Sequence, residues 1–115
     1  MRVLASERTL RSATEFQRVL RAGRAMSTPS LTVHTLRRED DLPGRHGLVV
    51  SRRHGGAVQR NRVRRRARAA LQRAGGIPPG FDSVIAVRPG EKVEVARLTE
   101  ELGQILEKIR RNGGK

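Results

Sequence analysis

The sequence has no cysteine, no tryptophan and no tyrosine, and its only aromatic residues are Phe16 and Phe81. Without cysteine, the chain can form no disulfide scaffold, no thiolate metal site and no cysteine nucleophile. So few aromatics count against modules that read single-stranded RNA mainly by stacking bases on a sheet. No apolar run is long enough to span a membrane, and the N-terminal residues lack a signal peptide's apolar segment, so no membrane partner is expected.

Acidic residues are also scarce, because 11 Asp and Glu stand against 25 Lys and Arg, a formal net charge of +14. Such an excess opposes compaction and folding does not require it, so we expect a polyanionic partner. The 115 residues, of which 36% are hydrophobic, are enough for one small core. We therefore expect a single intracellular domain over 1–115 that binds nucleic acid, with 1–11 as a basic, flexible arm.

Three segments have the pattern of helices. Ser12 and Glu15 fit a capping box, which predicts a helix over 13–22 that ends at Gly23. A second helix is predicted over 57–74, where apolar residues recur on one face. The residues after the last predicted strand also carry apolar side chains at helical spacing, which predicts a C-terminal helix packed by one face.

Three segments have the pattern of strands. Residues 31–36 alternate, residues 46–51 are centred on an apolar run, and residues 83–88 are almost continuously apolar and therefore expected to be buried. The first two flank a polar loop over 37–45 and are expected to pair as an antiparallel hairpin. Two or three strands are expected before the second helix and one strand after it. The expected fold is α+β, a two-layer sandwich of a small mixed sheet with helices, in the order α-β-β-β-α-β-α if three strands precede that helix.

The predicted helix over 57–74 has an unusual charge pattern. No acidic residue occurs between Asp41 and Asp82, and ten arginines lie in that interval, eight of them from Arg52 to Arg68. Like charges at i, i+4 repel, and a solvated helix face usually mixes signs. We interpret this array as a phosphate-binding surface, with an uncompensated solvated face as the alternative.

The remaining polar residues do not form a catalytic or metal-binding pattern. His34, His46 and His54 occur singly, without a carboxylate at metal-ligand spacing. The acidic run 39–41 is interpreted as a solvated turn rather than a metal site. No serine or histidine lies in a recognisable nucleophile motif, so we expect no metal on the protein and no catalytic residue for cutting a phosphodiester.

The segment from Val49 to Arg65, VVSRRHGGAVQRNRVRR, closely resembles the signature of the bacterial ribonuclease P protein subunit. In that family a strand ending in Val-Ser and two basic residues leads through Gly and Ala-Val into Arg-Asn-Arg-Val-Lys-Arg. The order of the other elements agrees over nearly the whole chain. The resemblance implies a left-handed strand–helix–strand crossover, although the general rule is right-handed.

The resemblance also implies a function, that of a protein cofactor in a cytoplasmic endonuclease whose RNA subunit, with bound Mg²⁺, removes the 5′ leader of precursor tRNA by hydrolysis. The expected partners are this catalytic RNA and the leader, and no DNA. Residues expected to contact the catalytic RNA are Arg60, Asn61, Arg62, Arg64, Arg65 and Arg68. Residues expected to line or border a leader cleft between the first helix and the sheet are Phe16, Leu31, Val33, His34, Arg52 and Arg53.

Two positions in the expected cleft depart from the family pattern, because Leu20 and His34 stand where relatives commonly have aromatics. His34 either stacks in place of a tyrosine or is structural, and Phe16 either lines the cleft or belongs to the core. Two other function classes stay open: a basic ribosomal or nucleoid-associated protein, and a self-sufficient nuclease. The Arg-Asn-Arg segment after a Val-Ser strand favours the ribonuclease P cofactor over a basic ribosomal or nucleoid-associated protein. The missing acidic and metal-binding residues disfavour a self-sufficient nuclease.

Overall fold

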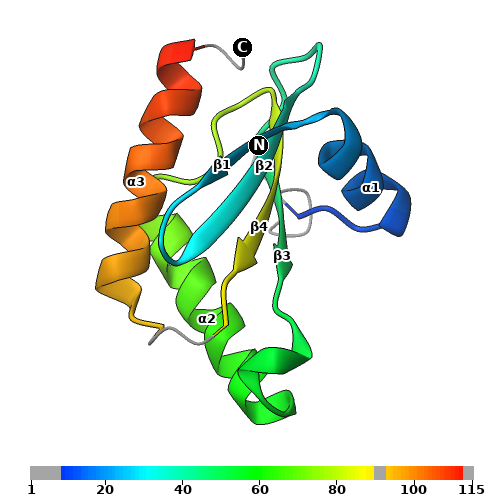
Figure 1. Cartoon of the computed structure of the whole chain (residues 1–115). Coiled ribbons are helices and arrows are strands. Elements are labelled where there is room, and N and C mark those ends of the chain that lie inside the picture. Colours follow the sequence, from blue (N-terminus) through cyan, green and yellow to red (C-terminus); the bar gives the residue numbers. More distant parts are fainter. Residues whose placement is uncertain (1–8, 90–92, 113–115) are drawn as a thin grey trace, which may run out of the picture.

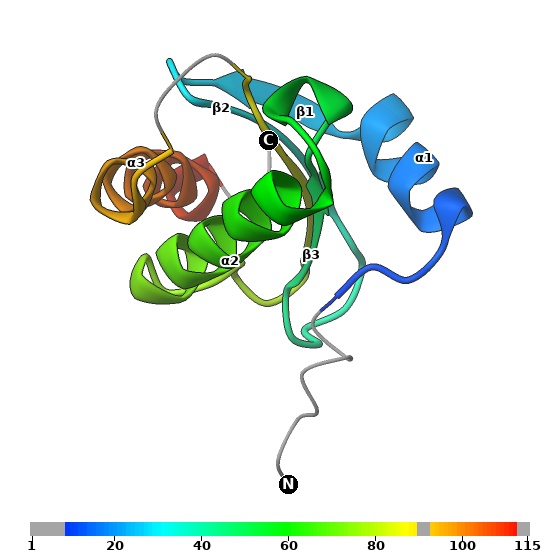
Figure 2. The same ribbon diagram turned by 90° about the horizontal axis from the view of Figure 1, so that it is seen from below.

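The computed structural model describes residues 9–89 and 93–112, which form three α-helices, four strands and one short 3-10 helix (Figure 1). The elements, in chain order, are α1 (Ala13–Ala22), β1 (Arg24–Ser27), β2 (Leu31–Arg37), β3 (Arg45–Val49), η2 (Arg52–His54), α2 (Ala57–Arg73), β4 (Phe81–Val87) and α3 (Val95–Asn112). This is the expected order of helices and strands. Helices α2 and α3 cover one face of the sheet, and α1 lies against the other (Figures 1 and 2).

The strand order in the sheet is β1-β2-β4-β3. Strands β1 and β2 are antiparallel, as are β2 and β4, whereas β3 runs parallel to β4. The predicted hairpin of β2 with β3 is therefore wrong, because β4 lies between them. The physical reason is that β4 carries apolar residues on both faces and is buried at every position except Ala86, which suits a central strand.

The unit β3-α2-β4 connects two parallel neighbours through a helix. Figures 1 and 2 show α2 on the same side of the sheet as α3, and β4 lies on the β2 side of β3, which makes the crossover left-handed. The expectation from the family resemblance is confirmed here against the general right-handed rule.

Two hydrophobic clusters hold the layers together. The larger lies between the sheet and helices α2 and α3, and includes Leu31, Ile85 and Leu102. The smaller lies beneath α1, where Val19 and Val84 are buried with Leu10. The unequal sizes mean that α1 rests on far less apolar surface than α2 and α3 do.

The segment expected as a flexible arm is partly packed on the fold. Residues 1–8 lie outside the described residues. Thr9 forms a parallel bridge with His46, the Leu10 backbone N–H donates to the His46 carbonyl at 2.9 Å, and the Leu10 side chain is buried. Leu10 thus belongs to the small cluster under α1 rather than to a solvated arm.

Candidate nucleic-acid interface

The basic side of α2 faces away from the sheet. Val63, Ala67, Ala70 and Leu71 are buried, as the helical periodicity predicts. The side chains on the other faces form what we call the arginine face: exposed Asn61, Arg62, Arg65 and Arg68, with half-buried Arg60 and Arg64. All six residues expected to contact the catalytic RNA therefore lie on one helix, which has no acidic side chain.

The hydrogen bonds of the α2 arginines show which of them hold the fold together. Arg66 Nη1 donates to the Val93 carbonyl at 2.9 Å, which ties α2 to the segment before α3. Arg64 Nη1 donates to Asn61 Oδ1 at 3.2 Å, a link within the arginine face. Among the described residues, the ion pairs are made by Arg38, Arg45, Arg97 and Arg111 and by none of the arginine face, so its charge remains available for an anionic partner.

The turn before α2 brings two further arginines to the end of the sheet. His54 Nε2 lies 2.8 Å from the Val87 carbonyl, which pins η2 to the last residue of β4. Arg52 and Arg53 in η2 are exposed at that point, and Arg88 follows Val87 directly. His54 is therefore a structural histidine, and it holds basic residues beside the sheet.

The register of the sheet defines three rows of side chains on the α1 side. The first row is Leu36, Asp82 and Arg45, the second is Ala25, His34, Val84 and Gly47, and the third is Ser27, Thr32, Ala86 and Val49. Helix α1 packs on the first row through Glu15 and on Val84 and Gly47 of the second through Val19 and Phe16, whereas Ala25 is exposed and His34 half-buried. In the third row Val49 is 41% exposed. We call this third row, together with Arg88 beside it, the open floor.

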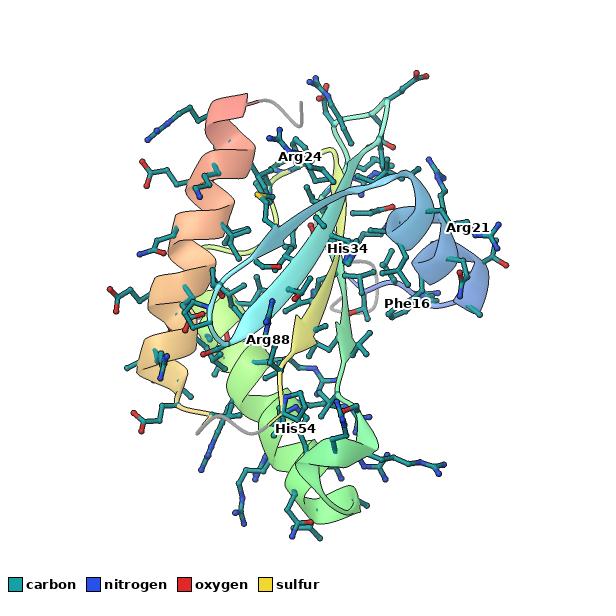
Figure 3. The ribbon with its side chains drawn as sticks, viewed as in Figure 1. Phe16, Arg21, Arg24, His34, His54 and Arg88 are labelled. Carbon is teal, nitrogen blue, oxygen red and sulfur yellow. The ribbon has the colours of Figure 1, made fainter. Side chains whose placement is uncertain are left out.

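Polar groups connect the open floor across strands. Arg88 Nη2 donates to Thr32 Oγ1 at 3.2 Å, and Ser27 Oγ lies 3.5 Å from the same hydroxyl. Figure 3 shows His34 and Arg88 on the sheet, with Phe16 on the α1 side. The floor therefore offers hydroxyls, a guanidinium and small apolar groups, and no aromatic side chain.

Two residues expected in the cleft lie on the wrong face. Leu31 and Val33 are 0% and 1% exposed, and both belong to the core beneath α2 and α3. Alternation along β2 turns Thr32 and His34 to the α1 side instead. The sequence pattern could not decide the face, because the strand carries side chains that can be buried on both sides. The expected cleft residues included none of the floor residues, which are Ser27, Thr32, Val49, Ala86 and Arg88.

Phe16 serves the packing of α1 and also borders the second row. An added Cβ at Gly47 would lie 2.3 Å from Phe16 Cζ, so the ring occupies the space that a side chain at position 47 would need. Phe16 is half-buried and packs against the small cluster with Leu36. Leu20, one helical turn later, is 39% exposed.

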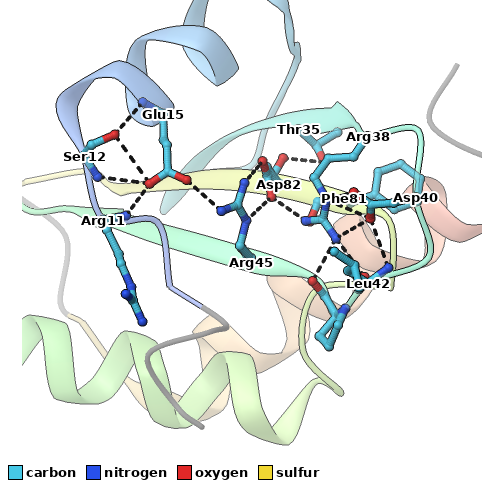
Figure 4. A network of polar contacts seen from close by, with 11 residues as sticks. Arg11, Ser12, Glu15, Thr35, Arg38, Asp40, Leu42, Arg45, Phe81 and Asp82 are labelled. Atoms are coloured by element: carbon cyan, nitrogen blue, oxygen red, sulfur yellow. Dashed lines mark hydrogen bonds and ion pairs between the residues drawn. The ribbon is translucent and has the colours of Figure 1, made fainter. Parts of the chain in front are cut away.

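A chain of ion pairs links α1 to the sheet (Figure 4). Arg45 Nη1 donates to Glu15 Oε2 at 2.6 Å, and Arg45 Nε and Nη2 donate to the two oxygens of Asp82 at 2.9 and 2.8 Å. Arg38 Nη1 donates to the same Asp82 carboxylate, while Arg38 Nη2 donates to the carbonyls of Leu42 and Pro43. The loop between β2 and β3 and the first turn of α1 are thus attached to one buried carboxylate.

The pKa values of these carboxylates are lowered. Burial would raise the pKa of Asp82, but the hydrogen bonds and charges of Arg45 and Arg38 outweigh it and hold the pKa below its usual value. The pKa of Glu15 is lowered first by the Arg11 backbone N–H and, against the effect of burial, by the Ser12 N–H and Arg45. The charged forms of Glu15 and Asp82 are therefore stabilised by contacts within the fold.

The described residues contain no group of three or more His, Asp or Glu side chains arranged to hold a metal ion. The acidic run 39–41 contributes Asp40 to an ion pair with Arg38 rather than to a cation site. In the same part of the chain, no helix is both long enough and apolar enough to cross a membrane.

Comparisons with known proteins agree over sequence and fold. A ribonuclease P family model matches residues 4–110. The ribonuclease P protein component of Clavibacter michiganensis is 38% identical over 104 residues, covering 87% of this chain and 90% of the relative. That of Chloroflexus aurantiacus is 39% identical over 102 residues, covering 84% and 73%.

Solved structures give the same result. The RNase P protein from Thermotoga maritima superimposes with a TM-score of 0.76 at 30% identity, covering 88% of this chain and 96% of that one. The RNase P protein of Staphylococcus aureus has a TM-score of 0.74 at 23% identity, covering 88% and 94%, and supports the fold alone.

Proposed function

Because the chain belongs to the ribonuclease P protein family, we propose that it binds two RNAs at once, the catalytic RNA through the arginine face of α2 and the precursor tRNA leader through the open floor. As a ribonuclease P protein component, the chain is a subunit of the ribonuclease P holoenzyme and takes part in tRNA processing with the RNA subunit. The proposal concerns which surface meets which RNA.

The charge of α2 supports the assignment of the catalytic RNA. The arginine face presents five guanidinium groups on a helix with no acidic residue in its first turn, where an anion is favoured by the free N–H groups. Arginine binds phosphate pairs bidentately, so a rigid helix carrying several of them suits the fixed phosphates of a folded RNA. A flexible leader would gain less from such a rigid array.

The shape and chemistry of the open floor support the assignment of the leader. An extended single strand fits along a strand face that no helix covers, and α1 provides one wall with Phe16 and Leu20. With His34 as the one ring on the sheet side, we infer that the floor holds sugar and phosphate through Thr32 and Arg88 more than it stacks bases. Leader sequence should then matter less than leader length.

The junction at η2 is the observation that carries the proposal. His54 fastens η2 to the end of β4, and η2 with its exposed Arg52 and Arg53 connects β3, which carries Val49 of the open floor, to α2, which carries the arginine face. A precursor tRNA leader that runs from the catalytic RNA bound at α2 toward the open floor would pass the positive charges of Arg52 and Arg53 on the way. Both RNAs can therefore be bound by one small domain.

We assign no catalytic residue to the protein. The carboxylates Glu15, Asp40 and Asp82 are engaged by arginines, and the described residues offer no cation cluster. Mg²⁺ bound to the RNA subunit would supply the chemistry, while this chain binds and orients the substrate. We expect it to act in the cytoplasm with no membrane or DNA partner.

Reconstitution tests this function. Precursor tRNA cleavage is measured at low Mg²⁺ concentration with the protein alone, the RNA subunit alone and both together. Cleavage that is restored only in the combined sample, with release of an intact 5′ leader, is the expected result. No gain over the RNA subunit alone would leave a general basic RNA-binding protein, as in a ribosome, and cleavage by the protein alone would indicate a nuclease.

A further inference from the structure

We propose that the ion-pair chain Glu15–Arg45–Asp82 is a positioning device that sets leader affinity by fixing α1 over the sheet, without contacting the leader itself. The inference rests on the proposed leader-binding role of the open floor. It concerns residues that touch neither of the two RNA-binding surfaces described above.

Helix α1 has little apolar contact to define its orientation. Among the described residues, the cluster beneath it has three buried members, Leu10, Val19 and Val84, whereas the cluster under α2 and α3 has sixteen. Non-directional apolar contact of this small extent permits a helix to tilt. A directional contact at the start of α1 is needed to define its angle.

Glu15 supplies that directional contact with both carboxylate oxygens. Oε1 accepts the backbone N–H groups of Arg11 at 2.8 Å and Ser12 at 3.1 Å, which closes the capping box of α1. Oε2 accepts from Arg45 Nη1 at 2.6 Å. One carboxylate therefore joins the helix's own first turn to strand β3.

The other end of this ion-pair chain is buried in the sheet. Asp82 is 2% exposed in the central strand β4, and it receives Arg45 through two parallel hydrogen bonds and Arg38 from the other side. The Glu15–Arg45 pair is half-exposed by comparison. It is therefore the adjustable link between a fixed sheet and a weakly packed helix.

The three rows of side chains on the α1 side of the sheet connect the Glu15–Arg45 ion pair to the open floor. The first row holds Glu15 through Arg45 and Asp82, the second seats the ring of Phe16 over Gly47, and the third is the open floor. Glu15 and Phe16 are consecutive in α1, so release of the first row would let the helix rotate over the second. The wall of the cleft would then move against the floor.

The variant Glu15→Gln isolates this role. Glutamine at the third helical position still serves the capping box, so the helix keeps its N-terminus, while the charge that pairs with Arg45 is lost. The matched control is Glu107→Gln, which removes the same charge from an exposed i, i+4 pair with Arg111 on α3. Arg45→Lys is the second variant, because one ammonium cannot hold Glu15 and both oxygens of Asp82 together.

Holoenzyme affinity is measured for precursor tRNA with a leader and for the same tRNA without one, together with protein affinity for the catalytic RNA. We expect Glu15→Gln to weaken binding of the leader-bearing substrate about threefold to tenfold. The affinity of the Arg45→Lys protein should lie between that of Glu15→Gln and that of the unaltered protein. Leaderless tRNA and catalytic RNA should bind as to the unaltered protein, and Glu107→Gln should change none of the three affinities.

The outcomes distinguish the inference from the function on which it rests. Equal losses with and without the leader would overturn it, because the ion pairs would then serve only general stability. An unaffected Glu15→Gln protein beside a Thr32→Val protein that loses leader affinity would overturn the positioning role and leave the cleft assignment intact. If neither variant affects the leader, the cleft assignment fails, and the inference fails with it.

Discussion

The ring of Phe16 on α1 packs directly against the backbone of Gly47 on β3. The aromatic ring fills the position of an absent side chain, since a Cβ at Gly47 would lie 2.3 Å from Cζ and 2.5 Å from Cε1 of Phe16. The second row of the sheet can therefore accept α1 closely, next to His34 and Val84. The glycine is required by this approach rather than by its backbone conformation, because Gly47 is not among the glycines with positive φ.

Gly47→Ala should destabilise the fold and displace Phe16. We expect the free energy of unfolding to fall by about 1–3 kcal/mol, as for other overpacked sites. The control is Gly103→Ala in α3, where nothing lies within 4 Å of an added Cβ, and alanine should stabilise the helix by about 0.5–1 kcal/mol. Chemical denaturation of both variants checks this, and a Gly47→Ala protein as stable as the unaltered one would contradict the packing of Phe16.

Arg65→Ala should lower the salt dependence of binding to the catalytic RNA. Arg65 is exposed at the centre of the arginine face, and each lost phosphate contact reduces the slope of log affinity against log salt by about 0.7–0.9. The control is Lys108→Ala, which removes an exposed charge from α3. An unchanged slope for Arg65→Ala would remove this residue from the interface.

Thr32→Val should weaken leader binding selectively. The substitution keeps the shape of the side chain but removes the hydroxyl that accepts from Arg88 Nη2 at 3.2 Å. We expect the affinity for leader-bearing precursor tRNA to fall by about twofold to fivefold, the effect of one hydrogen bond, with leaderless tRNA unaffected. Thr99→Val on α3, whose hydroxyl donates to the Val95 carbonyl, is the matched control. A loss that is the same for both substrates would place Thr32 outside the leader site.

Stability should fall in acid because of Glu15 and Asp82. Their pKa values in the fold lie below the ordinary values of 4.5 and 3.8, so the unfolded chain binds more protons in this range. The stabilisation is complete above those ordinary values and is lost as the pH falls through the lowered ones. Unfolding followed from pH 7 to pH 3 should show a shallower acid decline for Glu15→Gln than for the unaltered protein, and an identical decline would contradict the role of Glu15.

Local pattern predicted the helices well. The capping box at Ser12 and Glu15, the apolar stripe of α2 and its opposite arginine face all follow from spacings of three and four residues, which a helix converts directly into faces. The position of the arginine face on the exposed side of α2 was therefore predictable from the sequence alone, and its role as a nucleic-acid surface stays a prediction.

Non-local pairing could not be predicted in the same way. The insertion of β4 between β2 and β3 depends on contacts between distant segments, and the four-residue strand β1 is too short for a recognisable alternation. The expectation that Leu31 lines a surface on the α1 side of β2 was wrong, because Leu31 is buried in the core and Thr32 lies on that side instead. The contact of Arg45 with Asp82 joins residues 37 apart in the sequence, and no local signal marks it.

Site-specific photo-crosslinking in the assembled holoenzyme tests the two-surface account most directly. A photoreactive side chain is placed at position 86 on the open floor in one protein and at position 65 on the arginine face in another, and precursor tRNA is bound without cleavage. We predict that position 86 crosslinks to the 5′ leader and position 65 to the catalytic RNA. Crosslinks from both positions to the same RNA, or the reverse assignment, would contradict the account.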